Sequence, residues 1–192
     1  MSDRRTALLN AAIEQIASKG TRGMRIEKVA RAAGVSPALI YHHFGNRSRL
    51  LQQALQYVGE RADTYTRPVA GSARKMLLGL LASEFQDNRT VRTNSAAWGE
   101  LRDSAIFDAA LRPTLTALTQ KWVRSIAELV RSGHRDGSIS SVVNPEAAGI
   151  CFTALAEGLS SRWLAGLLST RAAREHLATG VNAMLNGTDD SG

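Results

Sequence analysis

The chain has 192 residues, of which 44% are hydrophobic and 21% charged, so it can bury a core and is not disordered as a whole. Polar residues interrupt every apolar stretch well before the roughly 18 residues of a membrane span, and the N-terminus lacks the apolar run of a secretory signal. The single cysteine, Cys151, excludes an internal disulfide framework and a cysteine-based zinc cluster. We therefore expect a cytoplasmic protein with no membrane partner.

Apolar residues recur at helical spacing along the whole chain, and no segment alternates as a strand does. The pattern predicts a first helix that ends at Gly20, followed by a loop, and a short second helix over residues 26–33. Ser36 as N-cap and Pro37 at the first helical position begin a third helix, which ends near Phe44. Asn46 then caps a fourth helix.

Pro68 and Gly71 interrupt the chain after the fourth helix, and we expect the domain boundary between residues 61 and 72. A fifth helix carries Met76 and Phe85. The polar run over residues 86–94 shows no apolar face and is expected to be a loop, with a short helix around Trp98 following it.

The chain after residue 110 predicts three more helices. A long one carries apolar residues from Leu111 to Val130, and Pro113 either begins or kinks it. Residues 133–137 are expected to form a turn. Pro145 opens a helix that reaches about residue 168, and the final helix spans residues 170–185.

Positive charge is concentrated at the N-terminal end of the sequence. Residues 1–49 hold nine basic and three acidic side chains, whereas residues 50–192 hold fifteen basic and fourteen acidic ones within a formal net charge of +7. A solvated basic face is one reading of this excess. The other is a module that binds a polyanion.

Residues 25–49 favour the second reading, because two short helices joined by a tight turn at Gly34 form a helix-turn-helix unit. Its apolar residues would form a small core against the first helix: Ile26, Val29, Ala30, Val35, Ile40 and Phe44. The opposite face of the third helix would then present Pro37, Ala38, Tyr41 and His42. Small residues permit a close approach to the major groove, while the Tyr41 hydroxyl and the imidazoles can bind phosphate or base edges.

The segment from Arg25 to Leu50, RIEKVARAAGVSPALIYHHFGNRSRL, resembles the DNA-binding domain of the TetR/AcrR transcriptional regulators. Most of the family pattern IA..AGVS...LY.HF..K..L is present, and the resemblance covers about residues 3–60. Residues 94–168, with Trp98, Glu100, Trp122 and a helix start at 144–148, resemble the ligand-binding half of the BetI-like branch.

The resemblance implies an all-α fold with two domains. Residues 1–62 would form a three-helix helix-turn-helix DNA-binding domain, and residues 63–192 a helical bundle for ligand binding and dimerisation. The family's DNA contacts carried onto this chain are Lys28, Ser36, Ala38, Tyr41, His42, His43 and Arg47. Arg47 stands where the family usually has lysine and should keep the phosphate contact. Leu39 either touches a thymine methyl group or packs inward.

Several residues admit two interpretations. The aromatic residues Trp98, Phe107, Trp122 and Phe152 either line a ligand cavity, with Glu100 and Arg102 as polar anchors, or belong to the core. Cys151 is expected to be a buried, inert thiol. Adjacent histidines point about 100° apart on a helix, so His42 and His43 are not expected to bind metal, and we expect no cofactor and no catalytic residues.

The last two helices are expected to form the dimer contact, the alternative being that their apolar residues cover the monomer core. The predicted interface residues are Ala154, Gly158, Leu164, Leu168, Leu177 and Val181.

Taken together, the sequence predicts a homodimeric, ligand-responsive repressor of transcription that binds a near-palindromic double-stranded operator, with an apolar or amphiphilic small molecule as its effector. The alternatives are an architectural DNA-binding protein without an effector, and a ligand-binding or enzymatic bundle with a vestigial N-terminal domain.

Overall fold

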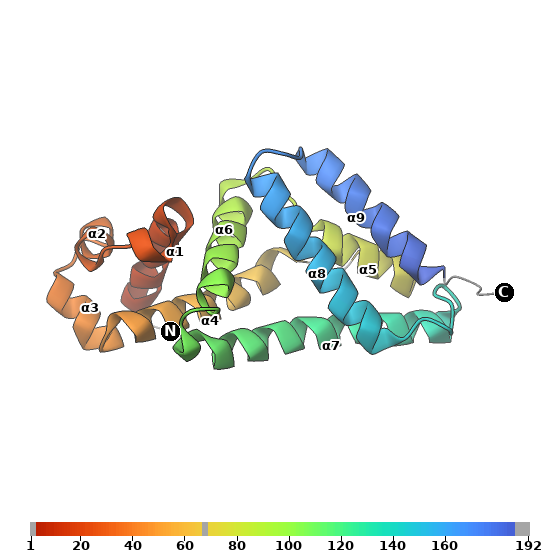
Figure 1. Ribbon diagram of the computed structural model, residues 1–192, viewed down its shortest axis with the longest axis horizontal. Coiled ribbons are helices and arrows are strands. Elements are labelled where there is room, and N and C mark those ends of the chain that lie inside the picture. The colour runs from red at the N-terminus through yellow and green to blue at the C-terminus, as the bar shows by residue number, and fades with distance from the viewer. Residues whose placement is uncertain (1–2, 67–68, 187–192) are drawn as a thin grey trace. The chain divides into compact units, whose positions relative to one another are not determined.

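The computed structural model describes residues 3–66 and 69–186, and every regular element in these ranges is a helix (Figure 1). The all-α prediction is therefore confirmed. The elements are α1 (Asp3–Gly23), α2 (Ile26–Ala32), α3 (Pro37–Phe44), α4 (Arg47–Tyr65), α5 (Ala73–Ala82), α6 (Arg89–Ser104), the 3₁₀ turn η1 (Ala109–Leu111), α7 (Arg112–Asp136), α8 (Pro145–Leu164) and α9 (Thr170–Leu185). No helix in the described part of the chain is both long and apolar enough to cross a membrane.

The chain forms two compact units. The first contains Met1–Ala62 together with Asn88–Leu118, and the second contains Asp63–Asp87 together with Thr119–Gly192. The DNA-binding helices expected from the sequence thus share a unit with α6 and the start of α7. The functional boundary between residues 62 and 63 stays a prediction.

The core of the first unit is built by apolar faces of α1, α2, α3, α4 and α6. Leu9, Ile13 and Ile16 of α1 are buried in it, as their helical spacing predicts. α1 packs along α6 and against α2, and α2 packs against α3. This arrangement fixes two short helices, α2 and α3, that have too few residues to be stable alone.

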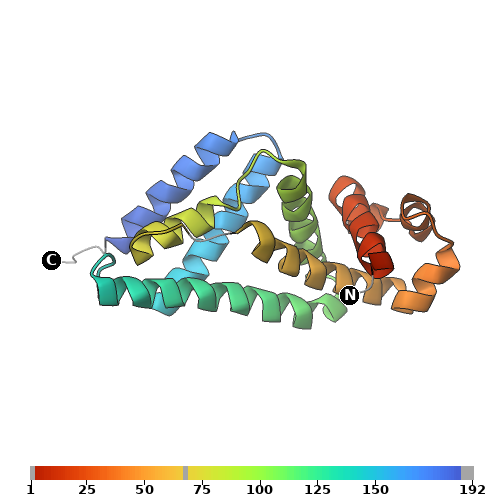
Figure 2. The ribbon, with the colours of Figure 1, turned by 180° about the vertical axis from the view of Figure 1, so that it is seen from behind.

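The core of the second unit lies among α5, the C-terminal part of α7, α8 and α9, which Figure 2 shows from behind. The rings of Phe85 and Trp163 meet edge to face with their centroids 5.7 Å apart. The Trp163 indole N–H donates to the Thr170 hydroxyl at 2.9 Å, and the Arg174 guanidinium donates to the Phe85 carbonyl at 2.8 Å. α9 is thereby tied to α8 and to the segment that follows α5.

The expected loop over residues 86–94 is confirmed for residues 86–88 and wrong for the rest, because α6 already begins at Arg89. Asn88 caps the helix by accepting a hydrogen bond from the Val91 N–H at 2.9 Å. Asn94 reads as polar in the sequence but is buried, since its amide donates to the Val58 carbonyl at 3.0 Å. Because Asn94 occupies a buried position that is usually apolar, the sequence pattern did not reveal the first turns of α6.

The expected turn over residues 133–137 is also wrong, because α7 continues to Asp136. Gly133 serves packing here, since a Cβ at this position would lie 2.5 Å from the side chain of Ile139. Two other boundaries differ by a few residues. α1 breaks at Gly20 but resumes to Gly23, and α8 ends at Leu164.

Candidate nucleic-acid interface

One face of α3 is buried and the opposite face is exposed. Ile40 and Phe44, one turn apart, are 1% and 2% exposed and pack into the core of the first unit. Ser36, Pro37, Ala38, Tyr41 and His42 are exposed, and Tyr41 keeps 49% of its surface. Leu39 and His43 are half-buried at the edges of this face. The exposure that DNA binding requires is present, whereas the contact itself stays a prediction.

The turn before α3 has the geometry that its glycine permits. Gly34 adopts a φ of 67°, and the Val35 N–H donates to the Ala30 carbonyl at 3.0 Å, which closes the end of α2. Ser36 occupies the N-cap position of α3 with an extended backbone, but its side chain makes no capping hydrogen bond. Ser36 is therefore the N-cap residue by position, but the predicted capping by its side chain is wrong.

The basic residues around α3 differ in what they contact. Lys28 is exposed on α2. Arg47, expected to bind phosphate, instead donates from its guanidinium to the main-chain carbonyl of Thr21. The structure therefore gives Arg47 an intramolecular partner that the spacing of residues did not reveal.

The N-cap prediction for Asn46 is confirmed, because its side chain accepts a hydrogen bond from the Arg49 N–H at 2.9 Å.

The two adjacent histidines of α3 are arranged edge to face, with their ring centroids 5.6 Å apart. Within the described ranges, no group of three or more His, Cys, Asp or Glu side chains is placed to hold a metal ion.

The four predicted ligand-lining aromatic residues occupy different environments. Trp98 and Phe107 belong to the first unit, and Trp122 and Phe152 to the second. Trp98 and Trp122 are half-buried, but Phe152 is fully buried in the core. Phe107 is 79% exposed with the Arg22 guanidinium 5.8 Å from its ring centroid, so the assignment of Phe107 to an enclosed cavity is corrected.

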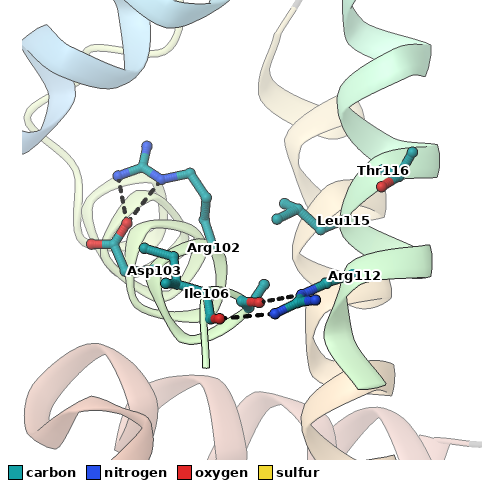
Figure 3. A pocket seen from close by; sticks show the side chains of 7 residues that line it. Arg102, Asp103, Ile106, Arg112, Leu115 and Thr116 are labelled. Carbon is teal, nitrogen blue, oxygen red and sulfur yellow. Dashed lines mark hydrogen bonds and ion pairs between the residues drawn. The ribbon is translucent and has the colours of Figure 1, made fainter. Parts of the chain in front are cut away.

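A solvent-open hollow of about 440 Å³ lies in the first unit between the end of α6 and the start of α7 (Figure 3). Its lining residues are Arg102, Asp103, Ala105, Ile106, Arg112, Leu115 and Thr116. Arg102 pairs with Asp103 at 3.0 Å, and Arg112 donates to the carbonyls of Ala105 and Ile106. Both arginines are thus engaged within the protein, and none of the four predicted aromatic residues lines this hollow.

The predicted polar anchors also have partners of their own. Glu100 accepts a hydrogen bond from the Thr21 N–H at 3.3 Å. Arg102 donates to Asp103, its neighbour in the chain, at 3.1 Å.

The predicted dimer residues divide into two groups. Ala154 is exposed, and Gly158, Leu164 and Leu168 are half-buried. Leu177 and Val181 are 1% and 0% exposed within their own protomer, which corrects their assignment to an outer face. These two residues lie one turn apart on the side of α9 that faces the unit's core.

Cys151 is exposed, so the expected burial of its thiol is wrong. Phe152 and Ala148 point into the core from α8, and Cys151 lies on the other side of the same helix.

Sequence inspection missed an acidic residue of the second unit, Glu84. Burial, and to a smaller extent the negative charge of Asp63, together raise the pKa of the Glu84 carboxyl from 4.5 to about 7. Asp63 itself pairs with Lys121 at 2.6 Å. In the described part of the chain, the Glu84 side chain has no hydrogen-bond or ion-pair partner. The available signal was a lone acid between the apolar residues Leu81 and Phe85.

Comparison with known proteins gives matches over most of the chain. Residues 8–54 match the family model "Bacterial regulatory proteins, tetR family", and residues 73–186 match "BetI-type transcriptional repressor, C-terminal". A crystal structure described as a TetR-family transcriptional regulator from Rhodococcus sp. is 42% identical, covers 97% of this chain and 100% of that chain, and superposes with a TM-score of 0.89.

Two further relatives are more distant. The HTH-type transcriptional regulator BetI of Rhizobium meliloti (strain 1021) is 33% identical over 98 residues, which are 50% of this chain and 48% of that protein. The chain thus spans about half the length of the BetI relatives that it matches. A transcriptional regulator from Saccharomonospora viridis, solved in complex with choline, is 22% identical over 95% of both chains, with a TM-score of 0.78.

The raised pKa of Glu84 predicts a pH-dependent stability. Between pH 4.5 and about 7 the folded chain holds a proton that the unfolded chain releases, so the Glu84 contribution lowers stability as the pH rises through this window. Glu84→Gln removes this effect. We expect its melting temperature to exceed that of the wild type at pH 8 by about 3 °C or more, with a much smaller difference at pH 4.5.

Calorimetric melts at both pH values measure the difference. Glu175→Gln is the matched control, because it makes the same change at an exposed position of α9. An equal effect of Glu84→Gln at pH 4.5 and pH 8 would contradict the prediction.

Proposed function

Since the chain belongs to the TetR family of bacterial regulatory proteins, with a C-terminal part of the BetI type, we propose that it is a ligand-responsive repressor that binds a near-palindromic operator as a homodimer. The family and the relatives are transcriptional regulators, and we propose no enzymatic reaction. The observation that carries the proposal is the exposed face of α3, on which Ala38, Tyr41 and His42 lie in a predominantly basic part of the sequence. The protein would act in the cytoplasm, where the bacterial chromosome lies.

The proposed division of labour on α3 follows from side-chain chemistry. Tyr41 would donate its hydroxyl to a phosphate, which positions the helix without reading sequence. Ala38 would permit close approach, and His42 would hydrogen-bond to base edges in the major groove. The Ser36 hydroxyl at the start of the helix makes no capping hydrogen bond and would contact the DNA as well. Lys28 would contact the flanking backbone, where its charge releases counterions.

A homodimer is supported by the outer face of α8. Ala147, Ile150, Cys151 and Ala154 are exposed on one side of this helix at helical spacing, and Ile150 keeps 59% of its surface. Gly158 continues the same stripe one turn later. Small residues let two helices approach closely, so α8 of one protomer would pack against its symmetry mate. This stripe replaces the part of the predicted interface that Leu177 and Val181 cannot supply.

We further propose that the effector is a small amphiphilic organic cation. An ionised carboxylate at Glu84 lacks a cationic partner among the described residues, and the half-buried Trp122 of the same unit offers an aromatic face of the kind that binds quaternary ammonium groups. The choline complex of the S. viridis relative is consistent with this ligand class.

DNA binding is tested by a gel-shift scan of the region upstream of the protein's own gene. We expect a discrete complex at moderate salt, with half-sites about 34–36 Å apart. Tyr41→Ala should weaken binding to every sequence by about 3- to 10-fold, because it removes one phosphate contact. His42→Ala should instead change the base preference at one position of each half-site.

The remaining outcomes separate the alternatives. Binding with a steep salt dependence but no preferred sequence would favour an architectural DNA-binding protein. Tight ligand binding without any affinity for DNA would favour a bundle with a vestigial N-terminal domain. Identical effects of both variants would refute the assigned roles of Tyr41 and His42.

Dimerisation through α8 is tested with Ala154→Arg. A buried arginine without a partner is costly, so this variant should sediment as a monomer at micromolar concentration and lose about 10-fold or more in operator affinity. Ser125→Arg adds the same charge at an exposed position of α7 and serves as the control. A wild type that sediments as a monomer, or an Ala154→Arg variant that remains dimeric, would count against this interface.

The effector class is tested by calorimetric titration with choline and with its neutral isostere 3,3-dimethylbutan-1-ol at pH 8. We expect choline to bind at least 10-fold more tightly than the isostere and to release the operator, and Glu84→Gln to remove this preference. Glu175→Gln should retain it. Equal binding of the two compounds, or a preference that survives Glu84→Gln, would exclude Glu84 as the counter-ion.

A further inference from the structure

Thr21 joins three helices of the first unit, because all of its hydrogen-bonding groups are engaged. Its N–H donates to the Glu100 carboxylate of α6 at 3.3 Å, and its hydroxyl shares a hydrogen bond with the Ser104 hydroxyl of α6 at 2.6 Å. Its carbonyl accepts a hydrogen bond from the Arg47 guanidinium of α4. Thr21 is only 6% exposed, so these contacts replace water.

The break in α1 explains why Thr21 needs these partners. Gly20 has a φ of 69° and a ψ of 167°, which interrupts the helical hydrogen-bond ladder and leaves the next N–H without its partner four residues earlier. A residue with a side chain is disfavoured at Gly20, both by this φ and because a Cβ would lie 2.9 Å from the Glu100 carboxylate. The break at Gly20 therefore both frees the Thr21 N–H for Glu100 and leaves room for that carboxylate beside α1.

The three contacts lie at both ends of the helix-turn-helix unit. Thr21 precedes α2 by five residues, and Arg47 is the first residue of α4, three residues after α3 ends. α6 thus holds the chain where it enters α2, and Arg47 links that same point to the place where the chain leaves α3. An error in this junction would tilt α3 even though its core residues Ile40 and Phe44 stay buried.

We infer that Thr21, with Ser104 and Glu100 as its anchors on α6, is a positioning residue that sets the orientation of α3 for operator recognition. The inference rests on the proposed DNA-binding function. It also gives Arg47 a role distinct from the phosphate contact expected from the sequence: its guanidinium fixes the start of α4 on the Thr21 carbonyl.

The test compares Thr21→Val with Thr21→Ser, because valine keeps the shape and the main-chain groups while serine also keeps the hydroxyl. Thr21→Val leaves the Ser104 hydroxyl without its partner, so we expect operator affinity to fall by about 5- to 10-fold. Thr21→Ser should stay within about 2-fold of the wild type. Affinity for random-sequence DNA at low salt should be unchanged in both, since it depends on charge and not on the orientation of α3.

Two further variants complete the design. Ser104→Ala combined with Thr21→Val should weaken operator binding no more than Thr21→Val alone, because both remove the same hydrogen bond. Thr93→Val makes the matched change elsewhere on α6 and should have no effect. Melting curves confirm that each variant is folded at the assay temperature.

The outcomes are distinguishable from failure of the proposed function. If the wild type forms no operator complex, the proposed function fails and this inference with it. If the wild type binds and Thr21→Val binds equally well, only the inference fails. It also fails if operator and random-sequence affinities fall together, because that result indicates a purely structural role for Thr21.

Discussion

The structure depends on the burial of one face of an eight-residue helix. A helix as short as α3 is unstable in isolation, because the cost of nucleation exceeds what so few hydrogen bonds return. Ile40 and Phe44 compensate by packing into the shared core of the first unit, where each contributes about 1.5–3 kcal/mol. The Arg5 guanidinium lies 5.7 Å from the centroid of the Phe44 ring and covers it further. The same burial decides which residues of α3 face outward.

A second constraint is the break in α1. A positive φ at Gly20 ends regular hydrogen bonding just before a buried residue, and buried polar groups without partners cost about 1–3 kcal/mol each. α6 and α4 supply those partners to Thr21. Consequently α6 and the helix-turn-helix unit form one compact body, although α3 and α6 are far apart in the chain.

Within the described ranges, two acidic residues of the second unit differ in whether a cation lies beside them: Asp63 has one and Glu84 does not. Asp63 has a cation, Lys121, within 2.6 Å, and the cost of its charge is offset. Burial and the repulsion of Asp63 both disfavour the charged form of Glu84, and its pKa rises to about 7 as a result. A residue that reduces stability at neutral pH while the rest of its unit is well packed is a natural candidate for a functional role.

The helical fold, the Gly34 turn, the exposed face of α3 and the limits of α9 could all be predicted from the sequence, because helical periodicity, glycine and proline act locally. Sequence inspection misjudged residues 89–94 and 133–137, where Asn94 and Gly133 look like loop residues until their partners, Val58 and Ile139, are known. The fold was needed to see that Arg47 bonds to Thr21, that Leu177 and Val181 face inward, and that the surroundings of Glu84 raise its pKa. Each of these depends on a neighbour distant in the chain, and no local pattern specifies which neighbour that is.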